Sequence, residues 1–344
     1  MVATTRFRVS VHAITDRGRT REHNEDTFLV ANLAGRVPLR TSRSEEYEIG
    51  ERGLLYLVAD GMGGAAAGEL ASEMAATQIY QYMIDTWGSD RDISEDRFAH
   101  RIREAVELAN LHIHSYAREH PDVRGMGTTA TVAGVWGDRL YLAQIGDSRG
   151  YLVRSGEARQ LTRDQSLTQR LVEVGELTEE QAETSERRNI ILQALGPDAR
   201  VKVDLSWQTL QRKDVLIICS DGLSTVVRRA DIAAVVQEEA DNTARICERL
   251  VAMANERGGP DNITVIAARF DGEDLPVTAN DEPGYHELIT TDEKPALQPT
   301  AAFPASRPPV AVPTPALRRT PTGLVLAALT VVMGIIATVL FLTR

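Results

Sequence analysis

Short apolar runs that end at an aspartate constrain the fold of this chain more than any other feature. Asp60, Asp147 and Asp221 each close such a run, and Asp261 lies just before another that begins at Ile263. Runs this short, rich in β-branched residues and separated by turn residues, predict strands. If the strand ends share one rim of a sheet, the four carboxylates lie in one cleft and repel one another unless a cation lies between them.

The apolar periodicity predicts an α+β body in which strands run as antiparallel hairpins and helices lie between them. The Gly137-Asp138 step between two apolar runs predicts a tight hairpin turn. Phe98, Ile102 and Ala105 begin an apolar stripe at helical spacing, which predicts a helix that faces the core. The expected strands are 54–59, 129–136, 139–145, 150–154, 201–205, 215–220 and 263–270. The expected helices are 66–87, 94–119, 166–173 and 229–257.

The four aspartates also indicate which ion they could hold. The seven histidines lack ligand spacing, and a site built from oxygen ligands alone favours Mg²⁺ or Mn²⁺. The run Gly61-Met62-Gly63-Gly64 lets the backbone approach a ligand closely. Two other interpretations apply. Each aspartate taken alone could form a turn or cap a helix, and the glycine run resembles a dinucleotide-binding fingerprint in which Ala66 replaces the third glycine.

The composition changes after residue 270. Of the 14 prolines, 10 lie from Pro276 onward, so residues 271–322 are expected to be a disordered linker. Residues 323–342 carry no charge and have the length that a membrane-spanning helix needs, although a buried core helix is the alternative. Arg318-Arg319 precedes this run and no apolar signal segment opens the chain, so we expect a C-terminal membrane anchor with the rest of the protein in the cytoplasm.

Charge and cysteine content argue against three classes of protein. The net charge of −11 argues against a nucleic-acid binder, which normally carries a basic face. The two cysteines, Cys219 and Cys247, belong to no CxxC pair, which argues against a disulfide scaffold and a structural zinc site.

Six short motifs occur in the chain in a fixed order. They are Arg21-Glu22-His23-Asn24-Glu25-Asp26, Asp60-Gly61-Met62-Gly63-Gly64, Gly127-Thr128-Thr129, Gly146-Asp147-Ser148-Arg149, Ser220-Asp221-Gly222 and Asp261-Asn262. Together they resemble the motif series of the PP2C-type (PPM) metal-dependent protein phosphatases. The resemblance runs from about residue 8 to residue 270, and six motifs in register are far more specific than any one of them.

The resemblance implies a four-layer α-β-β-α sandwich of two antiparallel sheets flanked by helices. It implies hydrolysis of phosphoserine and phosphothreonine on proteins at two Mn²⁺ or Mg²⁺ ions, with an optional third. By motif, Asp60 bridges the two metals, and the carbonyl of Gly61 ligates one of them. Asp221 and Asp261 hold the other, and Asp147 matches the third-metal position.

The first motif supplies the remaining site residues that the resemblance implies. Glu25 and Asp26 ligate metal or orient its waters, and the motif leaves open which of the two does each. Arg21 grips the phosphate, a task that suits a guanidinium because it can offer two parallel donors.

The chain departs from the family pattern at several places. Met62 stands where some members carry a histidine proposed as general acid, and a thioether cannot donate a proton, so that role would fall to water or another group. Gln165 follows Asp164 where a histidine is common. Residues 35–53 form a charged insert, expected to be a surface hairpin or loop, and residues 166–195 resemble the family's mobile flap.

These features predict three parts: a phosphatase domain at 1–270, a linker at 271–322 and a transmembrane helix at 323–342. The expected substrates are phosphorylated proteins, among them Ser/Thr kinases by analogy with the family. Two alternatives remain open. A pseudophosphatase would use the same fold as a membrane-bound phosphoprotein scaffold, and another hydrolase would act on a small phosphorylated metabolite. The presence of every motif carboxylate favours an enzyme, and the open cleft of the family favours protein substrates.

Overall fold

The structure is a computed structural model that describes residues 7–35, 38–185, 187–188, 190–239, 241–278 and 282–289. Its strands are β1 (Arg8–Asp16), β2 (Asp26–Asn32), β3 (Ser44–Glu48), β4 (Leu54–Met62), β5 (Gly127–Thr128), β6 (Ala130–Trp136), β7 (Arg139–Ile145), β8 (Arg149–Arg154), β9 (Glu157–Gln160), β10 (Asp204–Thr209), β11 (Val215–Cys219) and β12 (Ile263–Asp271). Its α-helices are α1 (Ala65–Asp85), α2 (Glu95–Glu119), α3 (Leu167–Glu173), α4 (Glu179–Thr184), α5 (Asp221–Ser224), α6 (Arg229–Glu238) and α7 (Thr243–Glu256).

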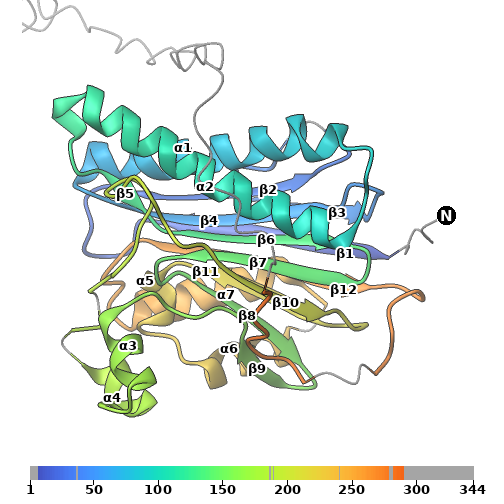
Figure 1. Ribbon diagram of the computed structural model, residues 1–344. Coiled ribbons are helices and arrows are strands. Elements are labelled where there is room, and N and C mark those ends of the chain that lie inside the picture. Colours follow the sequence, from blue (N-terminus) through green and yellow to red (C-terminus); the bar gives the residue numbers. More distant parts are fainter. Residues whose placement is uncertain are drawn as a thin grey trace, which may run out of the picture. The chain divides into compact units, whose positions relative to one another are not determined.

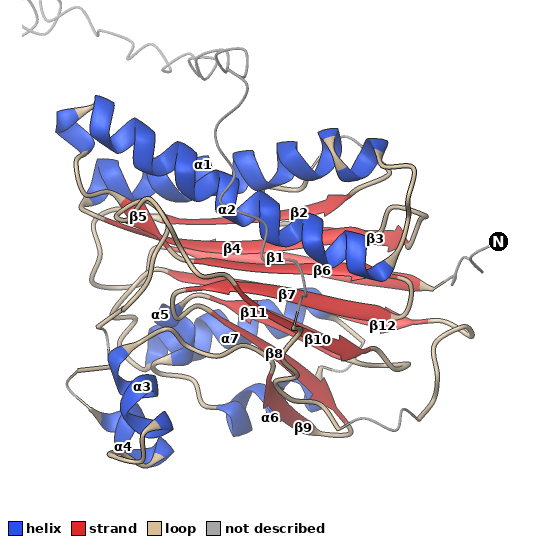
Figure 2. Cartoon of the chain, in the orientation of Figure 1, coloured by secondary structure: helices blue, strands red, loops and turns tan. Residues whose placement is uncertain are grey.

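The strands form two antiparallel sheets that face each other. One has the order β3-β1-β12-β11-β8-β9, and the other has the order β10-β7-β6-β4-β2, with β5 paired to β4. Helices α1 and α2 cover the outer face of the second sheet, and α6 and α7 cover that of the first (Figures 1 and 2). This is the expected α-β-β-α arrangement, and the α+β fold class is confirmed.

Three layers of apolar side chains stabilise the sandwich, one between the two sheets and one between each sheet and its helices. Successive side chains of a strand point to opposite faces of the sheet and therefore enter different layers. In β4, Leu55 and Leu57 pack toward α1 and α2, whereas Tyr56 and Val58 pack between the two sheets. In β11, Ile217 joins the layer beneath α6 and α7. Because these strands are covered on both faces, they read in the sequence as continuous apolar runs rather than as alternating ones.

The local predictions differ from the structure in a few places. The hairpin between β6 and β7 forms as expected, with Gly137 at a φ of 61°. The expected helix at 229–257 is instead two helices, because the side chain of Asn242 accepts a hydrogen bond from the backbone N–H of Arg245 at 3.1 Å and caps the start of α7. The expected strand at 201–205 begins only at Asp204, as β10.

Strand pairing also determines the conformation of the charged insert at residues 35–53. We expected a surface hairpin or loop, but Ser44–Glu48 pairs with β1 as an edge strand of the first sheet. The charged sequence of β3 suits an edge, where charged side chains discourage pairing with another chain. Its polar character concealed the strand in the sequence.

The region after β12 differs from the expectation of an unstructured linker where the structure describes it. Leu275 is buried, and the carbonyl of Pro276 accepts a hydrogen bond of 2.9 Å from the backbone N–H of Arg212. Residues 282–289 continue this contact with the domain. The expected membrane span at 323–342 lies outside the described residues, and within the described ranges no helix combines the length and hydropathy needed to cross a bilayer.

Candidate active site

The antiparallel register of β2 and β4 places Asp26 directly opposite Asp60. Like charges at opposite positions of a ladder repel. Burial, followed by the charge of Asp26, raises the pKa of Asp60 well above its usual range. The hydroxyl of Thr129 accepts a hydrogen bond of 3.0 Å from the backbone N–H of Asp60 and secures this end of β4. Two residues far apart in the sequence thus form the centre of the candidate site.

Asp26 is buried, and the facing sheet holds it in place. Its Oδ2 accepts hydrogen bonds of 2.7 Å from the hydroxyls of Ser220 and Thr264, while its Oδ1 is buried with no hydrogen-bond partner among the described residues. Burial raises the pKa of Asp26 to about 7. One oxygen is therefore anchored and the other is available to a ligand. Thr264 is a site residue that the motifs did not reveal, although a threonine within the apolar run of β12 indicates a buried hydroxyl that needs a hydrogen-bond partner.

Asp147 and Asp221 lie in the lining of one cavity of about 410 Å³. Asp147 follows β7, and Asp221 opens the short helix α5 after β11. The Oδ1 atom of each is buried without a partner in the described part of the chain. Burial, with the charge of Asp221 second, raises the pKa of Asp147 to about 8, and burial with Asp261 second raises that of Asp221 to about 6.

Arg21, Glu25 and Asp261 form the more exposed rim. An Arg21 Nη2 donates to Asp261 Oδ2 at 2.6 Å, so the predicted phosphate ligand and a predicted metal ligand pair with each other. The side chain of Arg21 remains 52% exposed, and its other N–H groups can still bind a phosphate oxygen. Asn262 Oδ1 accepts from the backbone N–H of Glu25 at 2.8 Å and fixes this rim.

Two motif glycines are required because backbone segments meet closely at the site. A Cβ at Gly61 would lie 2.2 Å from the carbonyl oxygen of Gly68, and one at Gly222 would lie 2.0 Å from that of Asn262. Neither contact tolerates a side chain. The sequence-based expectation of a close backbone approach at Gly61 therefore has a clear steric basis.

The residues present fit a hard cation. The unpartnered carboxylate oxygens are buried acceptors that a cation could bind. Burial first, and the charges of neighbouring aspartates second, raise the pKa values of Asp26 and Asp147, and a bound cation would offset both effects. In the described ranges, however, no three His, Cys, Asp or Glu side chains gather closely enough to enclose an ion alone. Mg²⁺ usually keeps several water ligands and needs only one or two carboxylates, so the two observations are compatible.

The family departure at Gln165 has a structural function. Gln165 Oε1 accepts from the backbone N–H of Gly146 at 3.0 Å, and its Nε2 donates to the carbonyl of Lys202 at 3.2 Å. The side chain thus supports the turn that carries Asp147. Met62 pairs with Gly127 at the end of β4.

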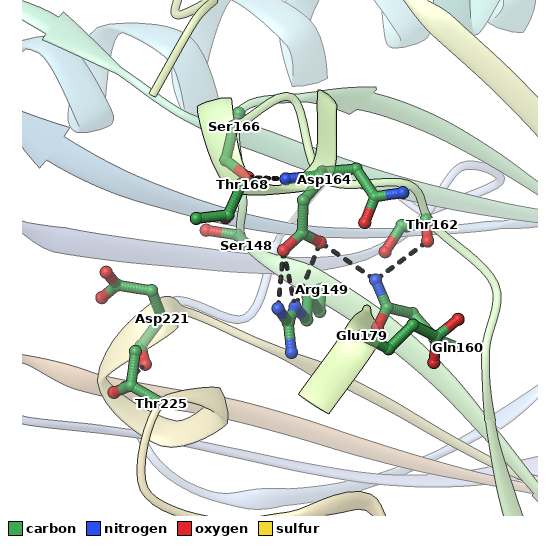
Figure 3. A network of polar contacts seen from close by, with 12 residues as sticks. Ser148, Arg149, Gln160, Thr162, Asp164, Ser166, Thr168, Glu179, Asp221 and Thr225 are labelled. Carbon is green, nitrogen blue, oxygen red and sulfur yellow. Dashed lines mark hydrogen bonds and ion pairs between the residues drawn. The ribbon is translucent and has the colours of Figure 1, made fainter. Parts of the chain in front are cut away.

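An ion pair forms one wall of the cavity. Arg149 donates from Nε and Nη2 to the carboxylate of Asp164, with a shortest distance of 2.6 Å (Figure 3). The segment 166–195 lies beside this wall, with Ser166, Thr168 and Glu179 in the cavity lining. The predicted flap therefore lies next to the candidate site.

Comparison with known proteins identifies the family of this chain. Residues 46–263 match the family model of protein phosphatase 2C. The serine/threonine phosphatase stp of Listeria monocytogenes is 35% identical over 258 residues, which are 75% of this chain and 94% of that protein.

Two solved structures resemble this one. The serine/threonine phosphatase PstP/Ppp of Mycobacterium tuberculosis has 34% identity and a TM-score of 0.64, over 77% of this chain and all of that one. A catalytic domain of PstP described in complex with two manganese ions has 34% identity and a TM-score of 0.61, with the same coverage. The resemblance seen in the motifs is confirmed, and the chain belongs to the protein phosphatase 2C family.

Proposed function

We propose that this phosphatase hydrolyses phosphoserine and phosphothreonine on proteins, with two Mn²⁺ or Mg²⁺ ions at the site of Asp26 and Asp60. The observation that carries the proposal is the pairing of these two carboxylates across β2 and β4, with Asp147 and Asp221 nearby. The manganese-bound relative supports the choice of metal.

The roles that we propose for individual residues combine the motif resemblance with the surroundings of each side chain. Asp60 is central, and its charge interacts with Asp26, Asp221 and Asp147, which suits a bridging ligand. Asp221 and Asp261 would hold one ion, and Asp60 and the carbonyl of Gly61 the other, with Asp147 at a third position. Hydrogen bonds from Ser220 and Thr264 fix one carboxylate oxygen of Asp26. We therefore propose that the buried Asp26 orients the water ligands of a bound metal ion. Glu25, at the more exposed rim, would then ligate the metal directly.

The bound ions would supply Lewis-acid activation of a water molecule and neutralise charge on the phosphoryl group. The chain itself needs no Ser or Cys nucleophile for such a reaction. Arg21 would orient the phosphate through its free N–H groups. Met62 cannot supply a proton, so solvent would protonate the leaving group.

The decisive experiment measures phosphate release by the full-length chain from a phosphothreonine peptide and from p-nitrophenyl phosphate. Each is measured with Mn²⁺, with Mg²⁺, with EDTA and in the Asp60→Asn variant. Metal-dependent turnover of the peptide that the variant loses is the expected result. Turnover of small phosphomonoesters alone would favour a metabolite hydrolase. A folded protein that binds the phosphopeptide without turnover under either metal would favour a scaffold.

We further propose that residues 323–342 anchor the enzyme to a membrane, with the catalytic domain in the cytoplasm. The uncharged run and the preceding Arg318-Arg319 support this topology. Anchoring would concentrate the enzyme near membrane-bound phosphoproteins, including Ser/Thr kinases. Deleting residues 323–342 should release the protein from the membrane fraction of lysed cells, and a deletion variant that still sediments with membranes would contradict the anchor.

A further inference from the structure

The cavity of about 410 Å³ beside the candidate site has a wall that the family motifs do not supply. Pro283, Gly284 and Tyr285 line it, together with Asp147 and Asp221. These three residues lie beyond the last strand of the phosphatase domain. A cavity of this size can accommodate side chains of a bound peptide.

The segment that carries Tyr285 is held to the domain by backbone hydrogen bonds. The backbone N–H of Trp207 donates to the carbonyl of His286 at 3.0 Å, and that of Leu288 donates to the carbonyl of Leu205 at 2.9 Å. Residues 282–289 thus pair with the free edge of β10, beside which the red end of the described chain runs in Figure 1. Tyr285 is therefore a fixed part of the cavity.

Tyr285 in turn orients an arginine. The guanidinium carbon of Arg163 lies 4.1 Å from the centre of the Tyr285 ring, and the Tyr285 hydroxyl donates to Asp204 Oδ1 at 2.6 Å. Arg163 Nε is 3.7 Å from Glu173 Oε1 on α3, and the side chain of Arg163 remains 45% exposed. A guanidinium stacked on a ring keeps its N–H groups free to bind an anion in the plane of the group.

Outside the candidate metal site, the side chains that line the cavity are mostly basic. It contains six arginines and four carboxyl groups, and two of the four, Asp147 and Asp221, belong to the candidate metal site. The six arginines are Arg149, Arg159, Arg163, Arg188, Arg228 and Arg229. Figure 3 shows Arg149 paired with Asp164, and Arg229 pairs with Glu179 at 3.2 Å. In the described part of the chain Arg163 forms one ion pair, the 3.7 Å contact with Glu173, and its charge also acts on Asp204. It is held less closely than Arg149 or Arg229 and remains exposed, so its N–H groups can bind an incoming group.

We propose that Arg163 and Tyr285 form a docking site for an anionic group that flanks the phosphorylated residue of the protein substrate. The group is a carboxylate or a second phosphate, since a guanidinium binds both in the same way. This inference rests on the proposed function and assigns a part in substrate selection to a segment that the sequence placed in the linker.

The test compares KM and kcat of the full-length chain on three phosphothreonine peptides of equal length. Their flanks carry glutamates, a non-hydrolysable phosphonate, or glutamines, and p-nitrophenyl phosphate serves as the reference substrate. The variants are Arg163→Ala and Tyr285→Ala. Tyr285→Phe, which keeps the ring under Arg163, and Arg245→Ala, an exposed arginine of α7 outside the cavity, are the matched controls.

We expect a lower KM for the two anionic peptides than for the neutral one. Arg163→Ala and Tyr285→Ala should raise the KM of the anionic peptides about two- to fivefold relative to the reference substrate, with little change in kcat. Both controls should retain the preference, and added salt should weaken it. A preference for the glutamate or for the phosphonate flank would identify the source of the anion.

Two results would overturn the docking site. One is equal KM for anionic and neutral peptides in the unaltered protein, and the other is a preference that survives in both alanine variants. Either leaves peptide hydrolysis intact, so it is distinct from failure of the proposed function, in which no phosphopeptide would be hydrolysed.

Discussion

Thr264→Val tests how the first sheet, which contains β12, supports the candidate site. Thr264 donates to Asp26 Oδ2 at 2.7 Å and itself contacts the hydroxyl of Thr15 at 2.8 Å. Valine keeps the shape and the β-branching but removes the hydroxyl. A hydrogen bond to a charged group contributes about 1.5–3 kcal/mol, so we expect the unfolding free energy to fall by about 2 kcal/mol above pH 7, where Asp26 is ionised. For a domain of this size that loss corresponds to a decrease in Tm of about 4–8 °C.

The same variant should weaken metal binding. Loss of a hydrogen bond that orients a carboxylate near a metal typically costs about 10- to 100-fold in affinity, so the Mn²⁺ concentration for half-maximal activity should rise by that factor. Saturating Mn²⁺ should restore most of kcat, and Thr264→Ser should behave like the unaltered protein. Ser206→Ala, which removes a neutral hydrogen bond of 2.9 Å to the carbonyl of Leu161, is the control for stability alone. An unaltered Mn²⁺ titration in Thr264→Val would refute the reasoning.

Three further predictions concern charge. Asp60→Asn should lower kcat about a hundredfold or more in a phosphopeptide assay, yet urea titration in EDTA should show equal or greater stability, because the amide removes repulsion within the site. A much less stable variant would contradict this account. Mn²⁺ at a hundred times its Kd should stabilise the unaltered protein by about 2.7 kcal/mol and raise its Tm in thermal scans, an effect that EDTA reverses and that Asp60→Asn should largely lose. Burial lowers the pKa of His112 in the folded protein below its value of about 6.5 in the unfolded chain. The folded protein therefore binds fewer protons at this side chain, and its unfolding free energy decreases as the pH falls below about 6.5. His112→Gln should therefore lose less stability than the unaltered protein between pH 7.5 and 5.5 in urea titrations, and equal losses would exclude this role.

The sequence by itself determined the elements that rest on local signals. The apolar runs of β4, β7 and β11 predicted strands because both of their faces are buried, and the Gly137-Asp138 step predicted the hairpin. The order of the motifs was enough to identify the family and to nominate the carboxylates. Each strand, turn and motif depends on residues close together in the chain, and the order of the motifs needs no knowledge of which distant residues meet.

Only the tertiary structure decided how distant residues meet. The register of β2 against β4 sets Asp26 opposite Asp60, and a shift of one residue would turn the two side chains to different faces. The anchoring of Asp26 by Thr264 joins residues 238 positions apart, which no local pattern encodes.

The segment 282–289 is the clearest case of a conformation that the local sequence does not predict. Its composition is that of a linker, and its conformation depends on the free edge of β10, which exists only once the sheet has formed. Backbone hydrogen bonds to such an edge are largely independent of side-chain identity, so the sequence carries no strong signal for them. The place of Tyr285 in the cavity wall is therefore a property of the folded domain.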